Sequence, residues 1–288
     1  MLNKYNEIIE NRLNDILSVK KNEYSHLLEA MAYSAEAGGK RIRPKLLLEF
    51  MRVAGGSPEK ALDFAVALEM IHTYSLIHDD LPCMDNDDMR RGKPSCHIKY
   101  SEATALLAGD ALLTDAFFVA LSTNGVPADH VLKAAKILAQ CAGSNGMIGG
   151  QVIDLKYEDS KAPLEVVLEL YRLKTGALLK AAASIGCVLA GADDRMLESA
   201  VEFAEKIGLA FQIRDDILDV ISTEEELGKP IGSDNESNKS TYVSLVGLEK
   251  AQNVVEILTN EAIDSLEVFG NEAAELKKLA LELVGRKN

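Results

Sequence analysis

The sequence predicts an all-α fold, a helical bundle formed by a single domain that spans residues 1–288. Apolar residues recur at helical spacing along most of the chain, whereas the alternation typical of strands is nearly absent. The chain contains only seven prolines, so few positions break a helix. No Gly/Ser-rich linker, internal repeat or shift in composition divides it, and we therefore expect one domain.

Eight segments carry the helical pattern. In chain order they are residues 2–16, 60–78, 102–121, 128–141, 163–189, 196–218, 251–263 and 272–284. The second and fifth are apolar around much of their circumference, which indicates a central position among the others. The uncharged stretch 181–192 is too short to span a bilayer, which takes about 20 residues, and we expect it inside a buried helix.

Turn signals separate several of these helices. Residues 55–58 and 124–127 have the Gly and Pro content of compact turns, and residues 228–238 form a longer polar loop. Ser57 followed by Pro58 predicts a helix start with serine as the capping residue.

The balance of charge limits the classes of partner. The sum 31 − 45 gives a net charge of −14, and its field would repel nucleic acids and anionic membranes. We therefore expect no nucleic-acid partner. A solvated acidic surface is the common cause of such a charge, and a divalent-metal site for phosphates is the other reading.

The cysteines and the N-terminus bear on location. The chain has no Cys-x-x-Cys pair and no His spacing suited to zinc. Its start lacks a continuous apolar segment, and we expect no membrane span. A cytoplasmic protein with reduced thiols fits these features best. The cysteines are Cys83, Cys96, Cys141 and Cys187.

The first of two acidic clusters follows the helix expected over residues 60–78. Asp79 and Asp80 are adjacent, and Asp85 comes six residues after Asp79. On an ideal helix Asp79 and Asp85 would point about 120° apart, but Pro82 distorts the turn and can bring them to one side. Mg²⁺ commonly bridges such carboxylates to a phosphate, whereas an isolated Asp-Asp pair is as often a solvated helix end.

The second cluster ends the helix expected over residues 196–218. Asp215 and Asp219 are four residues apart and share a helix face, close enough to hold one hard cation, while Asp216 points aside. Gln212 lies on the same face, where its amide could steady a phosphate or be satisfied by a backbone carbonyl. Two clusters on facing helices could grip one diphosphate.

Basic residues occur in separate short groups. They are Lys40, Arg41 and Arg43; Arg90, Arg91 and Lys93; Lys174 before Thr175; and Lys229 and Lys239. Arginine forks suit phosphate oxygens, although each group alone could merely offset nearby acid. His72, taken alone, is more often a hydrogen-bonded core residue than a ligand.

At these residues the sequence resembles the trans-polyprenyl diphosphate synthase family, and within it the bacterial farnesyl diphosphate synthases, or geranyltranstransferases. The resemblance covers nearly the whole chain. Its motifs occur in order as Gly38-Gly39-Lys40-Arg41-Ile42-Arg43-Pro44, Ile71-His72-Thr73-Tyr74-Ser75-Leu76-Ile77-His78-Asp79-Asp80, Asp85 with Arg90-Arg91-Gly92, Gly149-Gly150-Gln151, Lys174-Thr175 and Phe211-Gln212-Ile213-Arg214-Asp215-Asp216.

The resemblance implies a helical bundle of the isoprenoid synthase type around a deep central cavity, and it assigns roles. The implied ligands of two or three Mg²⁺ ions are Asp79, Asp80, Asp85 and Asp215, which Asp219 joins by its spacing. The implied isopentenyl diphosphate site comprises Lys40, Arg43, His72 and Arg91. The implied allylic diphosphate site comprises Arg90, Lys174, Thr175, Gln212 and Lys229. We expect Asp79, Asp80, Asp85, Asp215, Lys174 and Arg90 to be the catalytic residues.

The implied reaction joins isopentenyl diphosphate to dimethylallyl and then geranyl diphosphate, by ionisation, condensation and elimination, to give (2E,6E)-farnesyl diphosphate. Tyr74 lies five residues before Asp79, about 7.5 Å further down the helix. In similar enzymes an aromatic residue there limits growth to C15, and we expect Tyr74 with its neighbour Ser75 to set the product length, unless Tyr74 is ordinary core.

Three other readings remain. A geranylgeranyl diphosphate synthase would share the mechanism and make a C20 product. A terpene cyclase usually carries an Asn/Ser/Glu second metal motif, whereas this chain has Asp215 and Asp219. A non-catalytic partner subunit need not keep its aspartates. By analogy with similar enzymes we expect a homodimer.

Overall fold

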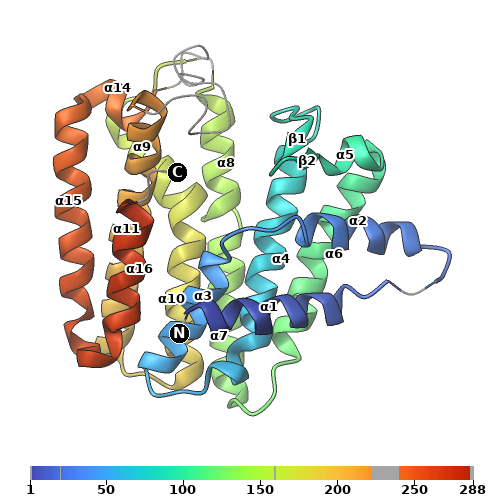
Figure 1. The fold of residues 1–288 in the computed structure, drawn as a ribbon, viewed down its shortest axis with the longest axis horizontal. Helices are drawn as coiled ribbons and strands as arrows, with labels where there is room; N and C mark the ends of the chain where they lie inside the picture. The colour runs from blue at the N-terminus through green and yellow to red at the C-terminus, as the bar shows by residue number, and fades with distance from the viewer. Residues whose placement is uncertain (1, 20, 159, 222–239, 286–288) are drawn as a thin grey trace.

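The computed structural model describes residues 2–19, 21–158, 160–221 and 240–285, which form a bundle of helices (Figure 1). Its α-helices are α1 (Leu2–Ile16), α2 (Ser25–Ala35), α3 (Ile42–Val53), α4 (Leu62–Asp79), α5 (Cys96–Lys99), α6 (Glu102–Leu121), α7 (Ala128–Ala142), α8 (Met147–Lys156), α9 (Leu164–Leu170), α10 (Ala177–Ala190), α11 (Asp194–Ile221), α14 (Tyr242–Val246), α15 (Leu248–Ser265) and α16 (Ala274–Gly285). Short 3₁₀ segments, η1 (Pro58–Ala61) and η3 (Leu266–Ala273), precede α4 and α16. The all-α prediction is confirmed.

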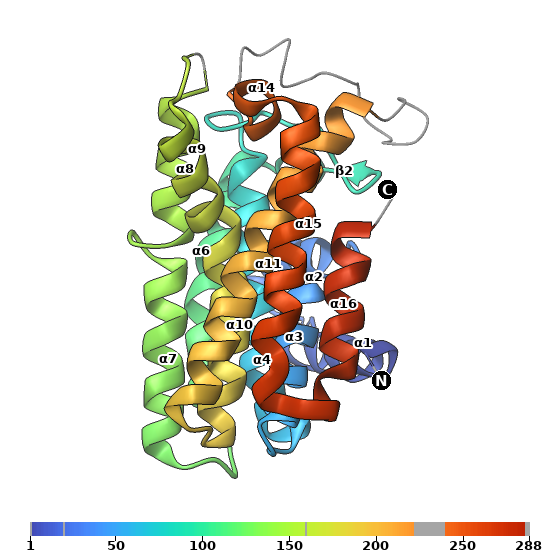
Figure 2. The ribbon, with the colours of Figure 1, turned by 90° about the vertical axis from the view of Figure 1, so that its left-hand side faces the viewer.

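The centre of the bundle is formed by the two helices that the sequence marks as apolar on most sides. Helix α10 packs against α3, α4, α7 and α11, and most of its side chains are buried (Figure 2). Helix α4 is buried from Phe64 to Ile71 without interruption. A helix in this position carries apolar residues on every face because each face meets another helix.

The segment expected as one helix over residues 163–189 contains a change of helical type. Between α9 and α10, η2 (Tyr171–Gly176) is a π-helical turn, so one extra residue is accommodated within the helix. The turn packs against α8 and α11. It therefore orients Lys174 and Thr175 differently from an unbroken α-helix.

A two-stranded hairpin follows the first acidic cluster. Strands β1 (Met89–Arg90) and β2 (Lys93–Pro94) pair antiparallel, with Arg90 opposite Lys93. The connecting residues Arg91 and Gly92 both have positive φ, 53° and 75°, as a two-residue hairpin turn of type I′ requires. The hairpin is too short to show strand alternation in the sequence.

One local expectation needs correction, and another is not tested. Ser57 does not cap the following helix, because its hydroxyl donates to the Glu59 carboxylate at 2.5 Å instead, while Pro58 does occupy the first helical turn. The polar loop expected over residues 228–238 lies outside the described residues.

The C-terminal ends of α4 and α11 lie at the same end of the bundle, uppermost in Figures 1 and 2. Near this end a second apolar cluster joins α9, η2, α11, α14 and α15 through side chains that include Val167, Tyr171, Ile217 and Val243. This packing fixes α11 where it carries the second acidic cluster. All four cysteines lie within the described residues and have free thiols.

Two helical stretches of the described chain are long and apolar enough to cross a membrane, Glu102–Leu121 and Leu164–Ala190. The second is mostly covered by the rest of the protein, as a core helix is. Helix α6 is covered less, and Leu107, Phe118 and Leu121 are exposed on it. The absence of a membrane span stays a prediction.

Candidate active site

The first acidic cluster turns back on itself at the end of α4. The backbone N–H of Asp85 donates to the carbonyl of Asp79 at 2.9 Å, which brings the two residues together as the Pro82 distortion predicts. Burial raises the pKa of Asp79 to about 6, the charge of Asp85 adds to this, and Lys174 opposes it. The positive charges around Asp79 thus do not fully compensate its buried carboxylate, although Lys174 is near enough to stabilise it.

Asp80 and Arg90 form an ion pair beside Asp79. The Nε of Arg90 donates to Oδ1 of Asp80 at 2.9 Å, and its Nη2 donates to the same oxygen. Asp80 is buried, whereas about a third of the Arg90 side chain is exposed. In this arrangement the two residues neutralise each other, and Arg90 keeps an accessible edge.

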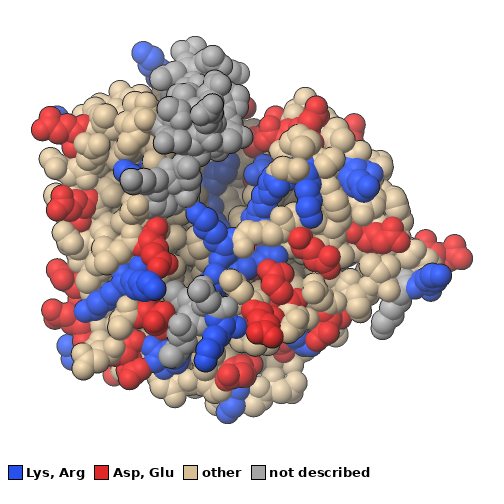
Figure 3. Space-filling model, viewed as in Figure 1, with Lys and Arg blue, Asp and Glu red and all other residues tan. Residues whose placement is uncertain are grey.

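A cavity of about 400 Å³ gathers the four residues expected to hold isopentenyl diphosphate, namely Lys40, Arg43, His72 and Arg91. They come from the loop before α3, from α3 and α4, and from the hairpin turn. Lys and Arg side chains gather in and around a hollow in the face of Figure 3, where Asp and Glu are more scattered. The Nε of Arg43 is buried with no hydrogen-bond partner among the described residues. A cationic pocket with an unused donor is suited to an anion.

The cations of this cavity change the ionisation of its histidine. Burial, reinforced by the charges of Arg43 and Arg91, holds the pKa of His72 well below its usual range. Burial and the neighbouring Arg91 also lower the pKa of Arg43. His72 is consequently neutral, and its ring presents one N–H donor and one acceptor to the cavity.

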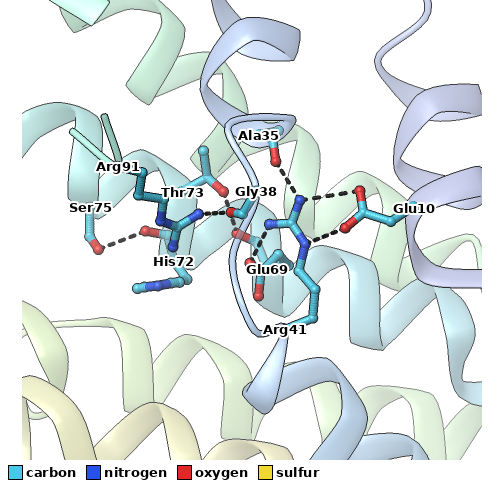
Figure 4. A network of polar contacts seen from close by, with 9 residues as sticks. All are labelled: Glu10, Ala35, Gly38, Arg41, Glu69, His72, Thr73, Ser75 and Arg91. Atoms are coloured by element: carbon cyan, nitrogen blue, oxygen red, sulfur yellow. Dashed lines mark hydrogen bonds and ion pairs between the residues drawn. The ribbon is translucent and has the colours of Figure 1, made fainter. Parts of the chain in front are cut away.

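Arg41, which the resemblance places in neither substrate site, fixes the loop before α3 (Figure 4). Its guanidinium donates to Glu10 on α1, to Glu69 on α4 and to the carbonyl of Ala35, each at 2.7 Å. Arg41 is 3% exposed and has a φ of 49°, in the left-handed region. Three elements are thereby tied to one side chain at the start of α3.

The hairpin closes over the same loop. The Nη1 of Arg91 donates to the carbonyl of Gly38 (Figure 4). A Cβ at Gly39 would lie 2.8 Å from that Nη1. The guanidinium can approach the loop this closely only because residue 39 has no side chain.

Lys174 projects from the π-helical turn and pairs with Asp154 on α8. The two groups are 2.5 Å apart, and Asp154 is buried. A Cβ at Gly150 would lie 2.3 Å from the backbone nitrogen of Lys174, so α8 and the turn are in backbone contact there. The motif Gly149-Gly150-Gln151 thus positions Lys174, together with Asp154 one turn further along α8.

Helix α11 carries Gln212, Asp215 and Asp219. Asp219 is buried, and its Oδ1 has no hydrogen-bond partner among the described residues. Asp216 points elsewhere, as expected, and accepts hydrogen bonds from the Tyr171 hydroxyl at 2.6 Å and from the backbone N–H of Tyr242 at 2.8 Å. It secures α14 to the π-helical turn.

Tyr74 and Ser75 lie on α4 below the acidic cluster. Tyr74 is buried, and its hydroxyl has no hydrogen-bond partner among the described residues. Burial, reinforced by the charge of Asp79, raises the pKa of Tyr74 to about 12. The hydroxyl of Ser75 donates to the carbonyl of His72 at 2.9 Å and so turns back to its own helix. Lys229 lies outside the described residues.

Among the described residues, no three His, Cys, Asp or Glu side chains converge on a point where they could hold a metal ion alone. The acidic groups stand on separate walls, Asp79 and Asp85 at the end of α4 and Asp219 on α11. Lys174 lies on the π-helical turn, which packs against α11. Such an arrangement suits an ion held partly by carboxylates and partly by a bound phosphate.

Comparisons with known proteins agree with this geometry. The family model described as "Polyprenyl synthetase" matches residues 24–277. A geranylgeranyl diphosphate synthase of Cyanophora paradoxa is 48% identical over 98% of this chain and 94% of its own length. A farnesyl diphosphate synthase of Geobacillus stearothermophilus is 47% identical over 87% of this chain and 85% of its own.

A crystal structure of an FPP/GFPP synthase from Zymomonas mobilis superposes with a TM-score of 0.89 at 38% identity, over 99% of this chain and 97% of that one. The match extends from the first helices to the last and includes both acid-bearing ends. The chain therefore belongs to the polyprenyl synthetase family, and the relatives named above are prenyl diphosphate synthases of that family.

Proposed function

We propose that the protein is a (2E,6E)-farnesyl diphosphate synthase, which condenses isopentenyl diphosphate with dimethylallyl and then geranyl diphosphate. The observation that carries this proposal is the cationic cavity of Lys40, Arg43, His72 and Arg91 beside the buried acidic end of α4. We assign one diphosphate to this cavity and a second to the region between the acidic clusters and Lys174.

The isopentenyl site binds by charge and by fixed donors. Arg43 offers a buried Nε without a partner among the described residues, and neutral His72 donates one hydrogen bond without adding charge. Arg41 does not belong to the ligand set, because its guanidinium is committed to Glu10, Glu69 and Ala35.

The residues present fit Mg²⁺. Asp79 has a pKa raised to about 6, and a buried oxygen of Asp219 has no partner among the described residues. A cation would relieve both features. We assign Asp79, Asp80, Asp85, Asp215 and Asp219 to two or three ions, with Arg90, Lys174, Thr175, Gln212 and Lys229 on the allylic diphosphate. When bound, the ions neutralise the departing diphosphate.

The chemistry then follows from position. The allylic C–O bond breaks and its electron pair leaves with diphosphate, whose charge Lys174 and Arg90 face. The double bond of isopentenyl diphosphate attacks the allylic carbon, a C–C bond forms, and a proton is lost to the released diphosphate. Lys174 is held for this task by Asp154 at 2.5 Å. Buried side chains around Tyr74 exclude water from the cation.

The length of the product rests on Tyr74. Its ring is buried on α4 about one and a half turns below Asp79, and we assign it to the end of the path of the growing chain. This favours C15. A C20 product is the second candidate, and it is favoured by the 48% identical relative, which is a geranylgeranyl diphosphate synthase.

A product assay separates these candidates. Purified protein is incubated with isopentenyl diphosphate, one of three allylic starters (C5, C10 or C15), and Mg²⁺ or excess chelator, and the products are sized. A metal-dependent C15 product with the C15 starter left unextended is expected. Extension to C20 would replace the farnesyl assignment by the geranylgeranyl one, and a cyclic hydrocarbon or no turnover would contradict the proposed activity.

A further inference from the structure

His78 lies between Tyr74 and helix α6 and touches both. Its ring meets the Tyr74 ring edge-on, with 5.7 Å between centroids and an interplanar angle of 77°. Its Nε2 lies 3.0 Å from the backbone carbonyl of Leu106 on α6. Because a carbonyl can only accept, Nε2 carries the proton and donates.

Gly109 makes this seat for the imidazole possible. A Cβ at residue 109 would lie 2.0 Å from Nε2 of His78 and 2.4 Å from its Cδ2. No real side chain tolerates such a separation, so any residue larger than glycine would displace the ring. The position of the imidazole ring therefore depends on two residues, His78 on α4 and Gly109 on α6.

We propose that His78, held by Gly109 and the Leu106 carbonyl, is a positioning residue that fixes the Tyr74 ring and so determines product length. The inference rests on the proposed function of Tyr74 as the stop for chain growth. The Tyr74 hydroxyl has no hydrogen-bond partner among the described residues. Because no described residue bonds this hydroxyl, the Tyr74 ring depends on packing for its orientation.

The variant His78→Ala tests the proposal. It removes the edge contact and leaves room beside Tyr74, which frees the ring to move from the path of the chain. An edge-to-face contact corresponds to a factor of up to about ten in an equilibrium. We therefore expect the C20:C15 product ratio to rise about tenfold, with total turnover of the C5 and C10 starters retained.

Two further variants keep the test decisive. His78→Gln restores a donor for the Leu106 carbonyl and is expected to recover part of the wild-type ratio. Gly109→Ala displaces the imidazole of His78 while residue 78 stays histidine, and we expect it to raise the C20:C15 ratio as His78→Ala does. It therefore tests the proposal even if His78→Ala fails to fold. His26→Ala is the matched control, because His26 also packs edge-on against a tyrosine, Tyr100, at 5.0 Å. It should leave the ratio unchanged.

A double variant shows whether the effect passes through Tyr74. If it does, Tyr74→Ala/His78→Ala has the same product ratio as Tyr74→Ala alone. A further rise in the double variant, or no change in both His78→Ala and Gly109→Ala, would overturn the inference. The farnesyl assignment fails separately, when the wild-type protein itself extends the C15 starter.

Discussion

At the level of single side chains, Arg41 is the residue whose loss should be felt most. Replacement by Ala leaves Glu69, which is 2% exposed, without its ion-pair partner. Breaking a buried pair in this way costs about 3–5 kcal/mol of unfolding free energy. Urea unfolding of Arg41→Ala should show a loss of this size.

The matched variant for Arg41→Ala is Glu10→Gln on α1. The Glu10 side chain is 38% exposed, so its ion pair is screened by water and its loss should cost much less. Equal losses in the two variants would mean that Arg41 acts through Ala35 or the loop backbone. A loss below about 1 kcal/mol for Arg41→Ala would contradict the buried clamp.

His72 should make the stability of the protein depend on pH. Its folded-state pKa is held well below 6.5 by burial and by Arg43 and Arg91, so the unfolded chain binds more protons at mildly acid pH. The stability from the neutral ring is complete above about pH 6.5 and is lost as the pH falls. Between pH 7.5 and 5.5 the loss should reach about 1.4 kcal/mol.

The variant His72→Gln removes this titration and supplies the comparison. Its unfolding free energy should fall less than that of the wild-type protein between pH 7.5 and 5.5, by the same amount. Parallel curves for the two proteins would show that the pKa of His72 is not lowered in the fold.

The sequence pointed to the side chains that line the cationic cavity better than to the side chains that hold them in place. Lys40, Arg43, His72 and Arg91 do meet in one cavity. Glu69, Asp154 and Tyr171 went unnoticed, because an ion pair or hydrogen bond between distant residues has no signature in spacing. Asp154 could have been found as the acidic residue three positions after Gln151, on the same helix face.

At the level of helices, the contact between α8 and the π-helical turn should be intolerant of added atoms. In Gly150→Ala the new Cβ would lie 2.3 Å from the backbone nitrogen of Lys174, where neither backbone can yield easily. Overpacking of this kind costs about 1–3 kcal/mol. Because Lys174 moves with the turn, the kcat/KM for the allylic substrate should fall at least about tenfold, an apparent barrier of about 1.4 kcal/mol.

Steady-state kinetics with each substrate varied in turn checks this prediction. The KM for isopentenyl diphosphate should change little, since its cavity is built from α3, α4 and the hairpin. Gly285→Ala is the control, because a Cβ there meets no atom of the described residues within 4 Å. An equal rise in both KM values would indicate general loosening rather than displacement of Lys174.

The helices predicted from periodicity were those with one clear apolar face or with apolar residues all round. Residues 2–16 and 102–121 match α1 and α6 at both ends. Helices α2, α3 and α8 were missed, as were the short helices α5 and α14. Helix α3 begins within the Gly-rich basic motif, and α8 contains Gly149 and Gly150, so both look like loops until packing against α10 or the π-helical turn is known.

The π-helical turn could not be predicted from the pattern of residues 163–189, because apolar spacing on either side of it remains helical. Its backbone path is set by tertiary contacts. Tyr171 bonds Asp216, Lys174 bonds Asp154, and Gly176 lies beside Gly208 of α11. The irregular turn coincides with the residues assigned to the allylic diphosphate, as π-bulges often coincide with functional sites.

For the molecule as a whole, the apolar surface of α6 and α8 is the main feature that the fold leaves uncovered. Leu107, Phe118 and Leu121 on α6 lie within about 60° of one another around the helix, and each is more than half exposed. On α8, Ile148 and Val152 are four residues apart and both are exposed. Helices α6, α7 and α8 stand together at the left of Figure 2.

A monomer rarely leaves an apolar patch of more than a few hundred Å² in water, whereas a stable dimer buries roughly 800 Å² on each partner. We therefore predict that two copies associate through this face. Phe118→Glu places a charge at its most exposed apolar residue, 75% accessible, and should convert the dimer to a monomer in sedimentation velocity at micromolar concentration. Leu281→Glu, at a 55% exposed leucine on α16, is the control and should remain dimeric.

The variant Phe118→Glu also tests whether association affects product length. Leu106 of α6 holds His78, so monomeric Phe118→Glu should show a raised C20:C15 ratio if association stiffens α6. Sedimentation of the wild-type protein as a monomer would remove the dimer, and an unchanged ratio in a monomeric Phe118→Glu would confine the control of product length to the single chain.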